Sequence, residues 1–211
     1  MRVISQEEFN KACTLHQEWW RGGDTGKRLD FAGCDLTKCK LKGLNLRRAN
    51  LRRANLREVD LREVDLEQAK LRGAILEGAI LEWADLREVD LRGADLERAK
   101  LRRANLEGAD LREATFEEAD LSMANLEGVD LTRVRLKGAN LEGANIDYTS
   151  WPLWCGSLEV TADEAICAQL MYHVARVMQN SGVSLDISIK DLANKAPQIE
   201  RYDLTKIGGE S

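Results

Sequence analysis

Residues 84–113 read ADLREVDLRGADLERAKLRRANLEGADLRE, six consecutive units that each begin with a small apolar residue, a polar residue and leucine. The apolar third residue recurs at every fifth position from Phe31 to Ile146, in 24 units without an insertion, and it is leucine in 21 of them. The first residue is Ala or Val in every unit from Ala49 to Ala144. A repeat of this regularity determines the fold.

A period of five excludes a single amphipathic helix and a single long strand. On a helix, steps of five residues advance each leucine by about 140°, which scatters the leucines around the cylinder. On a strand, side chains alternate faces with period two, so the leucines would change face at every unit. The pattern instead predicts a coil in which three extended residues point their first and third side chains inward and two further residues turn a corner. Successive coils then pair their backbones at about 4.8 Å.

Individual units carry a resemblance to a known family. The units ANLRR at 49–53, ADLRE at 84–88 and ADLRE at 109–113 resemble the A(D/N)LXX signature of pentapeptide repeat proteins, and the resemblance covers residues 29–148. It implies an all-β core that is a right-handed quadrilateral parallel β-helix with four pentapeptides in each coil. At that number, the 24 units make about six coils.

The flanking segments predict helical caps, which a solenoid needs because its ends expose open core and unpaired strand edges. SQEE at 5–8 is a capping box, apolar residues follow it at helical spacing, and Gly22-Gly23 would end the helix. A second capping box, TADE at 161–164, opens a longer C-terminal helix, and a shorter one follows from Ser188 to about Ala196. The expected parts are an N-terminal capping helix and turn in 1–28, the β-helix in 29–148, and a C-terminal cap with one long and one short helix in 149–211.

Composition argues against catalysis and against direct nucleic-acid binding. The 31 Lys and Arg against 36 Asp and Glu give a net charge of -5, whereas duplex binding usually needs a basic excess. The two histidines lie at opposite ends of the repeat, the five cysteines have no zinc spacing, and no phosphate loop or hydrolase motif occurs. We therefore expect no catalytic residue, no metal site and no cofactor. No apolar run reaches the roughly 18 residues of a membrane span and no signal peptide is evident, which predicts a cytoplasmic protein without a membrane segment.

The outer surface is the candidate site of function, and one row on it is basic. If four units make a coil, residues twenty apart stack, which aligns four arginines at about 4.8 Å spacing: Arg52, Arg72, Arg92 and Arg112. Such a row suits phosphates or an acidic partner. The alternative, which the sequence favours, is that Asp90, Asp110 and Glu113 neutralise part of it.

A second candidate surface is apolar. Ile75 and Ile80 replace the usual Asp or Asn of their units, and Trp83 follows at an outward position, all three in the predicted third coil. Exposed apolar groups that cluster indicate a partner. Local packing of the two isoleucines at a corner is an equal alternative.

Two classes of function follow. The first is a non-catalytic protein-binding or scaffold rod whose partner is unknown. The second comes from the resemblance, because some pentapeptide repeat proteins confer quinolone resistance by mimicking duplex DNA and binding DNA gyrase. The acidic stretch after Glu63 suits that role, whereas the arginine row and the basic stretch before Arg62 oppose it.

The C-terminal segment supports a separate hypothesis, a homodimer. It carries more apolar surface than one cap needs, and its candidate dimer or cap residues are Trp151, Leu153, Trp154, Ile166, Leu170 and Val174.

Overall fold

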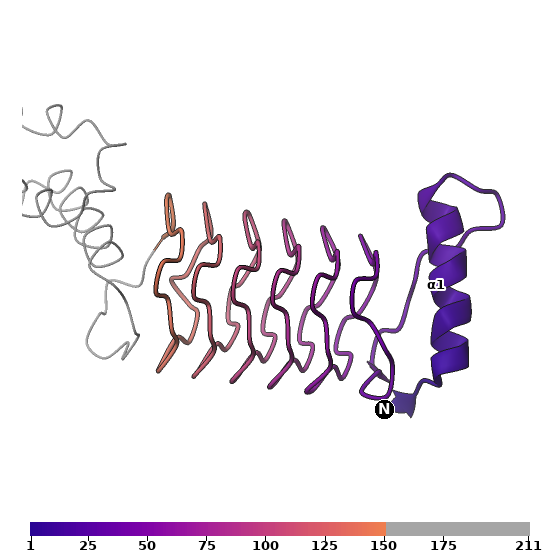
Figure 1. The fold of residues 1–211 in the computed structure, drawn as a ribbon, viewed down its shortest axis with the longest axis horizontal. Coiled ribbons are helices and arrows are strands. Elements are labelled where there is room, and N and C mark those ends of the chain that lie inside the picture. The colour runs from indigo at the N-terminus through magenta and orange to yellow at the C-terminus, as the bar shows by residue number, and fades with distance from the viewer. Residues whose placement is uncertain (151–211) are drawn as a thin grey trace, which may run out of the picture. The chain divides into compact units, whose positions relative to one another are not determined.

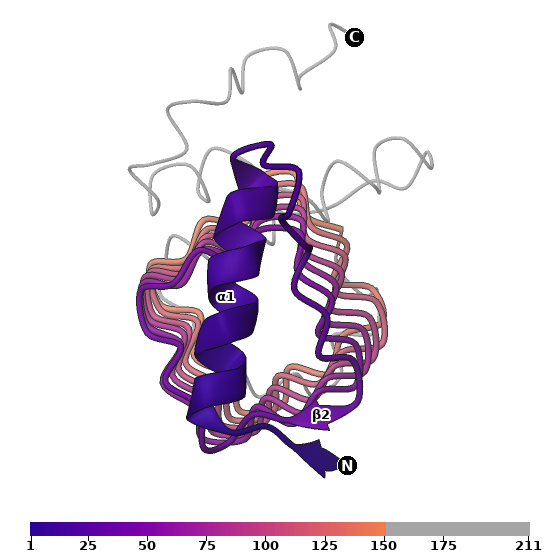
Figure 2. The same cartoon turned by 90° about the vertical axis from the view of Figure 1, so that its right-hand side faces the viewer.

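The computed structural model describes residues 1–150, all of which fall in one compact unit, Met1–Thr161. Its named elements are β1 (Arg2–Val3), α1 (Gln6–Trp20) and β2 (Cys34–Asp35). Beyond β2 the chain winds through stacked coils, seen from the side in Figure 1 and end-on in Figure 2. The predicted C-terminal helices, and every residue assigned to the C-terminal dimer or cap, lie outside the described residues. Within residues 1–150, no helix has the length and apolar character that crossing a bilayer requires.

The coils stack with a register of twenty residues. One-residue parallel bridges join Asp65 to Asp85, Asp85 to Asn105 and Asn105 to Asn125, and the same spacing recurs from Asp30 to Ser150. A register of twenty with a repeat of five places four pentapeptides in each coil. We call the units that stack at this spacing a column, so the repeat has four columns.

Each unit combines a short bridge with a tight turn. In the unit around Leu66, Leu66 N donates to Asp85 O at 2.8 Å in the next coil, and Asp85 N donates back to Val64 O at 2.9 Å. The turn closes when Ala69 N donates to Leu66 O at 2.9 Å. Gln68, the second turn residue, has φ 57°, the left-handed value that a type II turn requires at this position. Glycine occupies this position in many units because it adopts positive φ without steric cost.

The polar residue before each leucine has a structural role that the sequence analysis did not assign. Asp85 Oδ1 accepts from Arg87 N at 3.2 Å, and Asn105 Oδ1 accepts from Glu107 N at 3.2 Å. These are Asx-type bonds from a side chain to the backbone two residues later. The recurrent Asp and Asn side chains therefore stabilise the turn that follows the leucine of their own unit.

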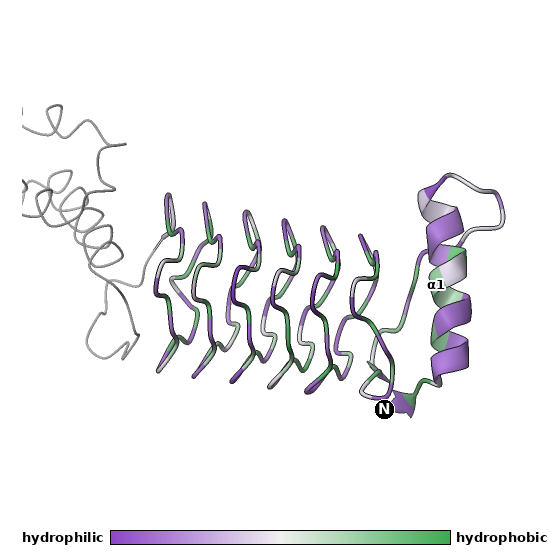
Figure 3. Cartoon of the chain, in the orientation of Figure 1, coloured by the Kyte–Doolittle hydropathy of each residue, from purple (hydrophilic) through white to green (hydrophobic). Residues whose placement is uncertain are grey.

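The core is the inward row of leucines with the small residues between them. The central apolar residues from Leu36 to Ile146 are at most 1% exposed, and the neighbouring Ala and Val are at most 7% exposed. Figure 3 shows the resulting alternation of hydrophobic and hydrophilic residues along each coil. The predicted inside and outside of the repeat are confirmed.

Helix α1 lies across the N-terminal opening of the coils, as Figure 2 shows. The Ser5 side chain accepts from Glu8 N at 3.2 Å, as a capping box predicts, but the Glu8 carboxylate pairs with Arg2. The ring of Phe9 stacks on Phe31 at 5.7 Å between centroids, and His16 Nδ1 accepts from Leu29 N at 3.1 Å. Phe9 and His16 are the fully buried residues of α1, while the apolar Ala12, Leu15 and Trp19 are half-buried.

Two boundaries differ from the expected ones. Strand β1, which the sequence did not predict, pairs in parallel with β2 so that Arg2 lies beside Cys34 and Val3 beside Asp35. Ile4 follows in the inward position and is fully buried. At the other end, Ser150 still bridges Asp130, so the register continues two residues beyond the expected end at 148.

Candidate functional site

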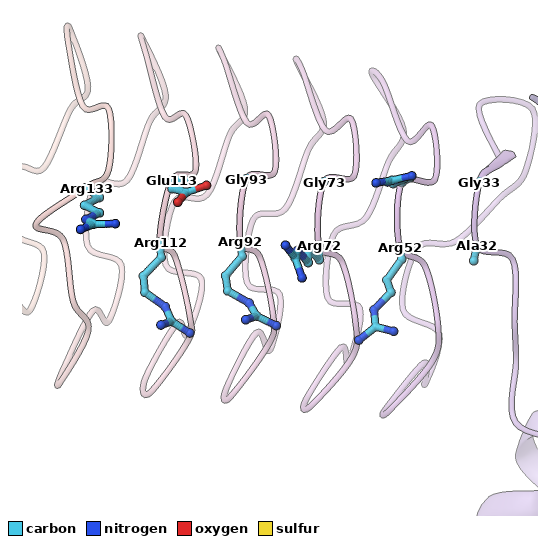
Figure 4. Close-up of a pocket in the computed structure, with 11 residues that line it drawn as sticks. Ala32, Gly33, Arg52, Arg72, Gly73, Arg92, Gly93, Arg112, Glu113 and Arg133 are labelled. Atoms are coloured by element: carbon cyan, nitrogen blue, oxygen red, sulfur yellow. The ribbon is translucent and has the colours of Figure 1, made fainter.

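The four aligned arginines lie in one column, as the register of twenty requires. Arg52, Arg72, Arg92 and Arg112 each occupy the first turn position of a unit and line an open groove of about 890 Å³. We call the column of these units the arginine column and the hollow the arginine groove. Figure 4 shows the arginines as one row and Gly33, Gly73, Gly93, Glu113 and Arg133 as a parallel row of second turn positions. The groove is hollow where glycine supplies no side chain in that second row.

Half of the arginine row is neutralised by aspartates of its own column. Arg92 Nε lies 2.8 Å from Asp90 Oδ1 and 3.3 Å from Asp110 Oδ2, and Arg112 Nη2 lies 2.7 Å from Asp110 Oδ2. The hydrogen bond from each arginine side chain lowers the pKa of its aspartate below the ordinary range. Asp90 and Asp110 therefore neutralise this end, as expected.

The units of Arg52 and Arg72, residues 49–53 and 69–73, contain no acidic residue of their own. The residues two places before Arg52 and Arg72 are Asn50 and Lys70, where Arg92 and Arg112 have aspartates. Within residues 1–150, neither Arg52 nor Arg72 forms an ion pair. Glu113 lines the same groove but forms no ion pair in the described part of the chain, so its part in neutralising the row stays a prediction. Within the arginine column, the two arginines that follow an aspartate by two residues are paired, and the two that follow Asn50 and Lys70 are not.

Ile80 and Trp83 belong to the same unit, 79–83, whereas Ile75 lies in the preceding unit and so in the adjacent column. Ile75 bridges Asn55 and Asp95, whereas Ile80 bridges Asp60 and Lys100, so the two lie in adjacent columns with polar neighbours on both sides. Both side chains are half-buried. A role of either isoleucine in binding a partner stays a prediction.

Trp83 also belongs to a stack along the column that it shares with Ile80. It is 57% exposed and has φ 62°, and the guanidinium carbon of Arg103 lies 4.5 Å from its ring centroid. Arg103 Nε also donates to Met123 Sδ at 3.4 Å, and Met123 is 50% exposed. We call Trp83, Arg103 and Met123 the tryptophan stack. Sequence analysis missed it, although the spacing of twenty residues was the signal that would have found it.

The carboxylates of an acidic cluster in the column of Leu66 form ion pairs with arginines. One ligand atom each from Asp65, Glu67 and Asp85 lies within 4.8 Å of the others. Arg87 Nη2, however, lies 2.8 Å from Glu67 Oε2 and 2.5 Å from Asp85 Oδ2. Arg47 pairs with Asp65 at 3.3 Å and with Glu67. The cluster is an ion-pair network that satisfies its own charges.

Comparison with known proteins agrees with this architecture. The family model described as pentapeptide repeats matches in 8 copies, in overlapping segments 30–68, 65–103, 79–117, 94–133 and 109–147. These segments span more than half of the chain, so the chain belongs to the pentapeptide repeat family. The fold of that family is the right-handed quadrilateral β-helix, which confirms the predicted class of fold.

Three solved structures illustrate the likeness. QnrB1, a plasmid-mediated fluoroquinolone resistance protein, is 18% identical, covers 70% of this chain and 85% of its own, and has a TM-score of 0.47. A pentapeptide repeat protein from the thylakoid lumen of Arabidopsis thaliana is 34% identical, with 53% and 70% covered and a TM-score of 0.33. HetL, a protein involved in heterocyst differentiation regulation from the cyanobacterium Nostoc, is 31% identical, with 59% and 81% covered and a TM-score of 0.24. No curated protein matches the sequence. Likeness at these TM-scores carries no argument about the partner of this chain.

Proposed function

We propose that this chain is a non-catalytic protein-binding rod that presents rows of aligned side chains to a partner. The rod consists of six coils, four pentapeptides to a coil, with α1 and β1 closing its N-terminal end. Twenty-residue bridges and the packing of Phe9 on Phe31 support this arrangement. The cytoplasmic location stays a prediction from the sequence.

The observation that carries the proposal is Trp83. An aromatic residue at positive φ is sterically unfavourable, and 57% of this side chain is in contact with water. Glu58, Glu63 and Glu88 occupy equivalent second turn positions, so the fold does not require tryptophan there. Trp, Arg and Met, the members of the tryptophan stack, are the residue types most enriched at protein interfaces.

Affinity capture from bacterial lysate with mass spectrometry tests the proposal. Wild type is compared with Trp83→Glu, which places at this turn a residue that other turns already carry. Glu63→Gln, twenty residues earlier in the same column, is the matched control, and Ile80→Lys tests the isoleucine originally expected to bind. A protein captured by wild type and by Glu63→Gln but lost with Trp83→Glu supports the tryptophan stack. Equal capture by all four forms would reject it.

A second candidate, modulation of DNA gyrase by DNA mimicry, is favoured by one column. The column of Leu66 continues through Leu106. In this later part it stacks Glu107, Glu127 and Asp147 in one row and has no Lys or Arg from residue 88 to residue 150. Inhibition of gyrase supercoiling by wild type and not by Glu107→Lys/Glu127→Lys would support this function. Supercoiling that is unchanged at saturating protein would exclude it.

We propose separately that the chain forms a homodimer through its C-terminal segment. The residues of that segment lie outside the described part of the chain, so the proposal rests on the sequence alone. Light scattering after size exclusion measures it directly. A mass close to the 23.7 kDa of one chain at high concentration would contradict it.

A further inference from the structure

We propose that the arginine groove binds an extended acidic peptide segment of a partner protein, through Arg52, Arg53 and Arg72. The inference rests on the proposed function, since it supplies a second contact for a protein partner. It identifies the chemistry of that contact as carboxylates held by guanidinium groups.

The first support is the uneven pairing of the row. Arg92 and Arg112 are engaged by Asp90 and Asp110, whereas Arg52, Arg53 and Arg72 have no ion pair within residues 1–150. An arginine aligned with its neighbours in a rigid coil is repelled by them until an anion lies between them. Free guanidinium groups in fixed positions therefore favour a ligand with several carboxylates, which each accept two parallel hydrogen bonds.

The second support is the shape of the groove. A Cβ built on Gly73 would lie 3.5 Å from the Arg53 side chain, so Arg53 extends over the glycine and lines the hollow. A Cβ built on Gly93 or Gly33 would meet nothing within 4 Å, which leaves room on both sides of Arg53. The side chains of the two rows in Figure 4 thus line a groove that is open to solvent.

The third support distinguishes a peptide from a nucleic acid. The part of the groove with unpaired arginines at this end is short, because Arg92 and Arg112, which follow Arg72 in the same column, are already paired with Asp90 and Asp110. A long polyanion would therefore meet few free guanidinium groups directly beyond Arg72. Neighbouring coils are about 4.8 Å apart, while alternate side chains of an extended peptide lie about 6.7 Å apart. The three free arginines lie in two neighbouring coils, so two carboxylates on one side of a peptide are enough to contact them. The net charge of -5 adds repulsion against any ligand that extends beyond them.

The test is fluorescence anisotropy of a fluorescein-labelled hexaglutamate peptide titrated with the full chain at low salt. Arg52→Gln/Arg72→Gln should raise Kd about tenfold or more, since each lost guanidinium removes charge-assisted hydrogen bonds. Lys42→Gln/Arg102→Gln is the matched control, because it removes the same charge from the same turn position of a different column. That control should change Kd by less than about threefold.

A gain-of-binding variant excludes misfolding as an explanation. Asp90→Asn removes the nearer of the two carboxylates that pair with Arg92 and leaves Asp110 at 3.3 Å, so it should make the Arg92 guanidinium more available and tighten peptide binding. Asp120→Asn, at the same unit position in another column, removes the same charge and should have the smaller effect.

Each outcome either supports or rejects the arginine groove as a binding site for an acidic peptide. Hexaglutamate binding that is weakened by the arginine pair and strengthened by Asp90→Asn supports the site. Tighter binding of a short labelled DNA duplex through the same arginines, or no difference between the two double variants, overturns it. The lysate capture with Trp83→Glu is independent: a partner lost only there, with no peptide binding, rejects the groove and keeps the proposed function. Peptide binding without any captured partner keeps the groove as a peptide site and rejects the proposed function.

Discussion

At the scale of the residue, the inward leucines are the positions where the protein tolerates substitution least. Leu91 is fully buried, in a row that has apolar side chains above and below it. The small Ala and Val positions leave no room for a long side chain to escape to water.

We expect Leu91→Lys to lower the free energy of unfolding by about 4 kcal/mol or more, because it buries an unpaired charge. Urea unfolding followed by circular dichroism measures this loss. Arg102→Lys, on the exposed surface, should change stability by less than about 0.5 kcal/mol. A similar effect of the two substitutions would mean that the row is not packed as described.

His16 predicts a pH dependence of folding. The side chain is 1% exposed, and burial lowers its pKa below the ordinary value, with the Arg47 carbonyl opposing the shift in part. The unfolded chain therefore takes up a proton below pH about 6.5 that the folded chain does not, so stability falls as the pH decreases from there. His16→Asn, which keeps an acceptor for Leu29 N, should give a flatter stability profile between about pH 6.5 and pH 5. Parallel profiles for both forms would refute the assignment.

At the scale of the element, the ends of the repeat depend on contacts that are distant in sequence. The helix α1 was predicted from its capping box and from Gly22, since both signals are local. Strand β1 was not, because two residues without a repeat around them carry no period, and their partner β2 lies about thirty residues away. The sequence left two structural roles open for His16, packing within the cap or exposure at the surface, and its burial on α1 agrees with the first.

Gly26 holds the turn after α1 against the helix. A Cβ at this position would lie 2.1 Å from Trp19 N, a clash with backbone that no side-chain movement relieves. We expect Gly26→Ala to destabilise the protein by about 2 kcal/mol or more, measured by thermal or urea unfolding. Gly22→Asn is the control, because Gly22 has φ 79° and open space around it, and asparagine tolerates that conformation. Equal stabilities would show that the turn moves away from the helix without cost.

At the scale of the whole repeat, the register of twenty residues controls which side chains meet. It was predicted from the period of five together with the four-sided coil implied by the family, and it placed the four arginines in one column correctly. Sequence reasoning did not identify which arginines are free, although the signal was present in Asn50 and Lys70. It also missed the tryptophan stack, because the comparison of residues twenty apart was applied to the arginines alone.

Removal of one coil tests the register. In a chain lacking residues 86–105, Arg72→Cys and Arg112→Cys should lie in neighbouring coils about 4.8 Å apart, within reach of a disulfide. In the full-length chain the same two cysteines lie two coils apart and should not cross-link. Oxidation followed by peptide mapping measures the bond. A chain lacking only residues 86–90 is the control, since position 112 then belongs to a different column, and cross-linking there would contradict the register.

The same register determines which surface residues share a column, much as a reading frame determines which bases share a codon. Adding or removing twenty residues lengthens or shortens every column and leaves each in frame, so the chemistry of a face survives a change in length. Adding or removing five leaves the buried leucines in phase but shifts the frame of the surface by one side, which joins the beginning of one face to the end of another. Insertions that the core cannot distinguish would thus differ completely to a partner that binds along one column.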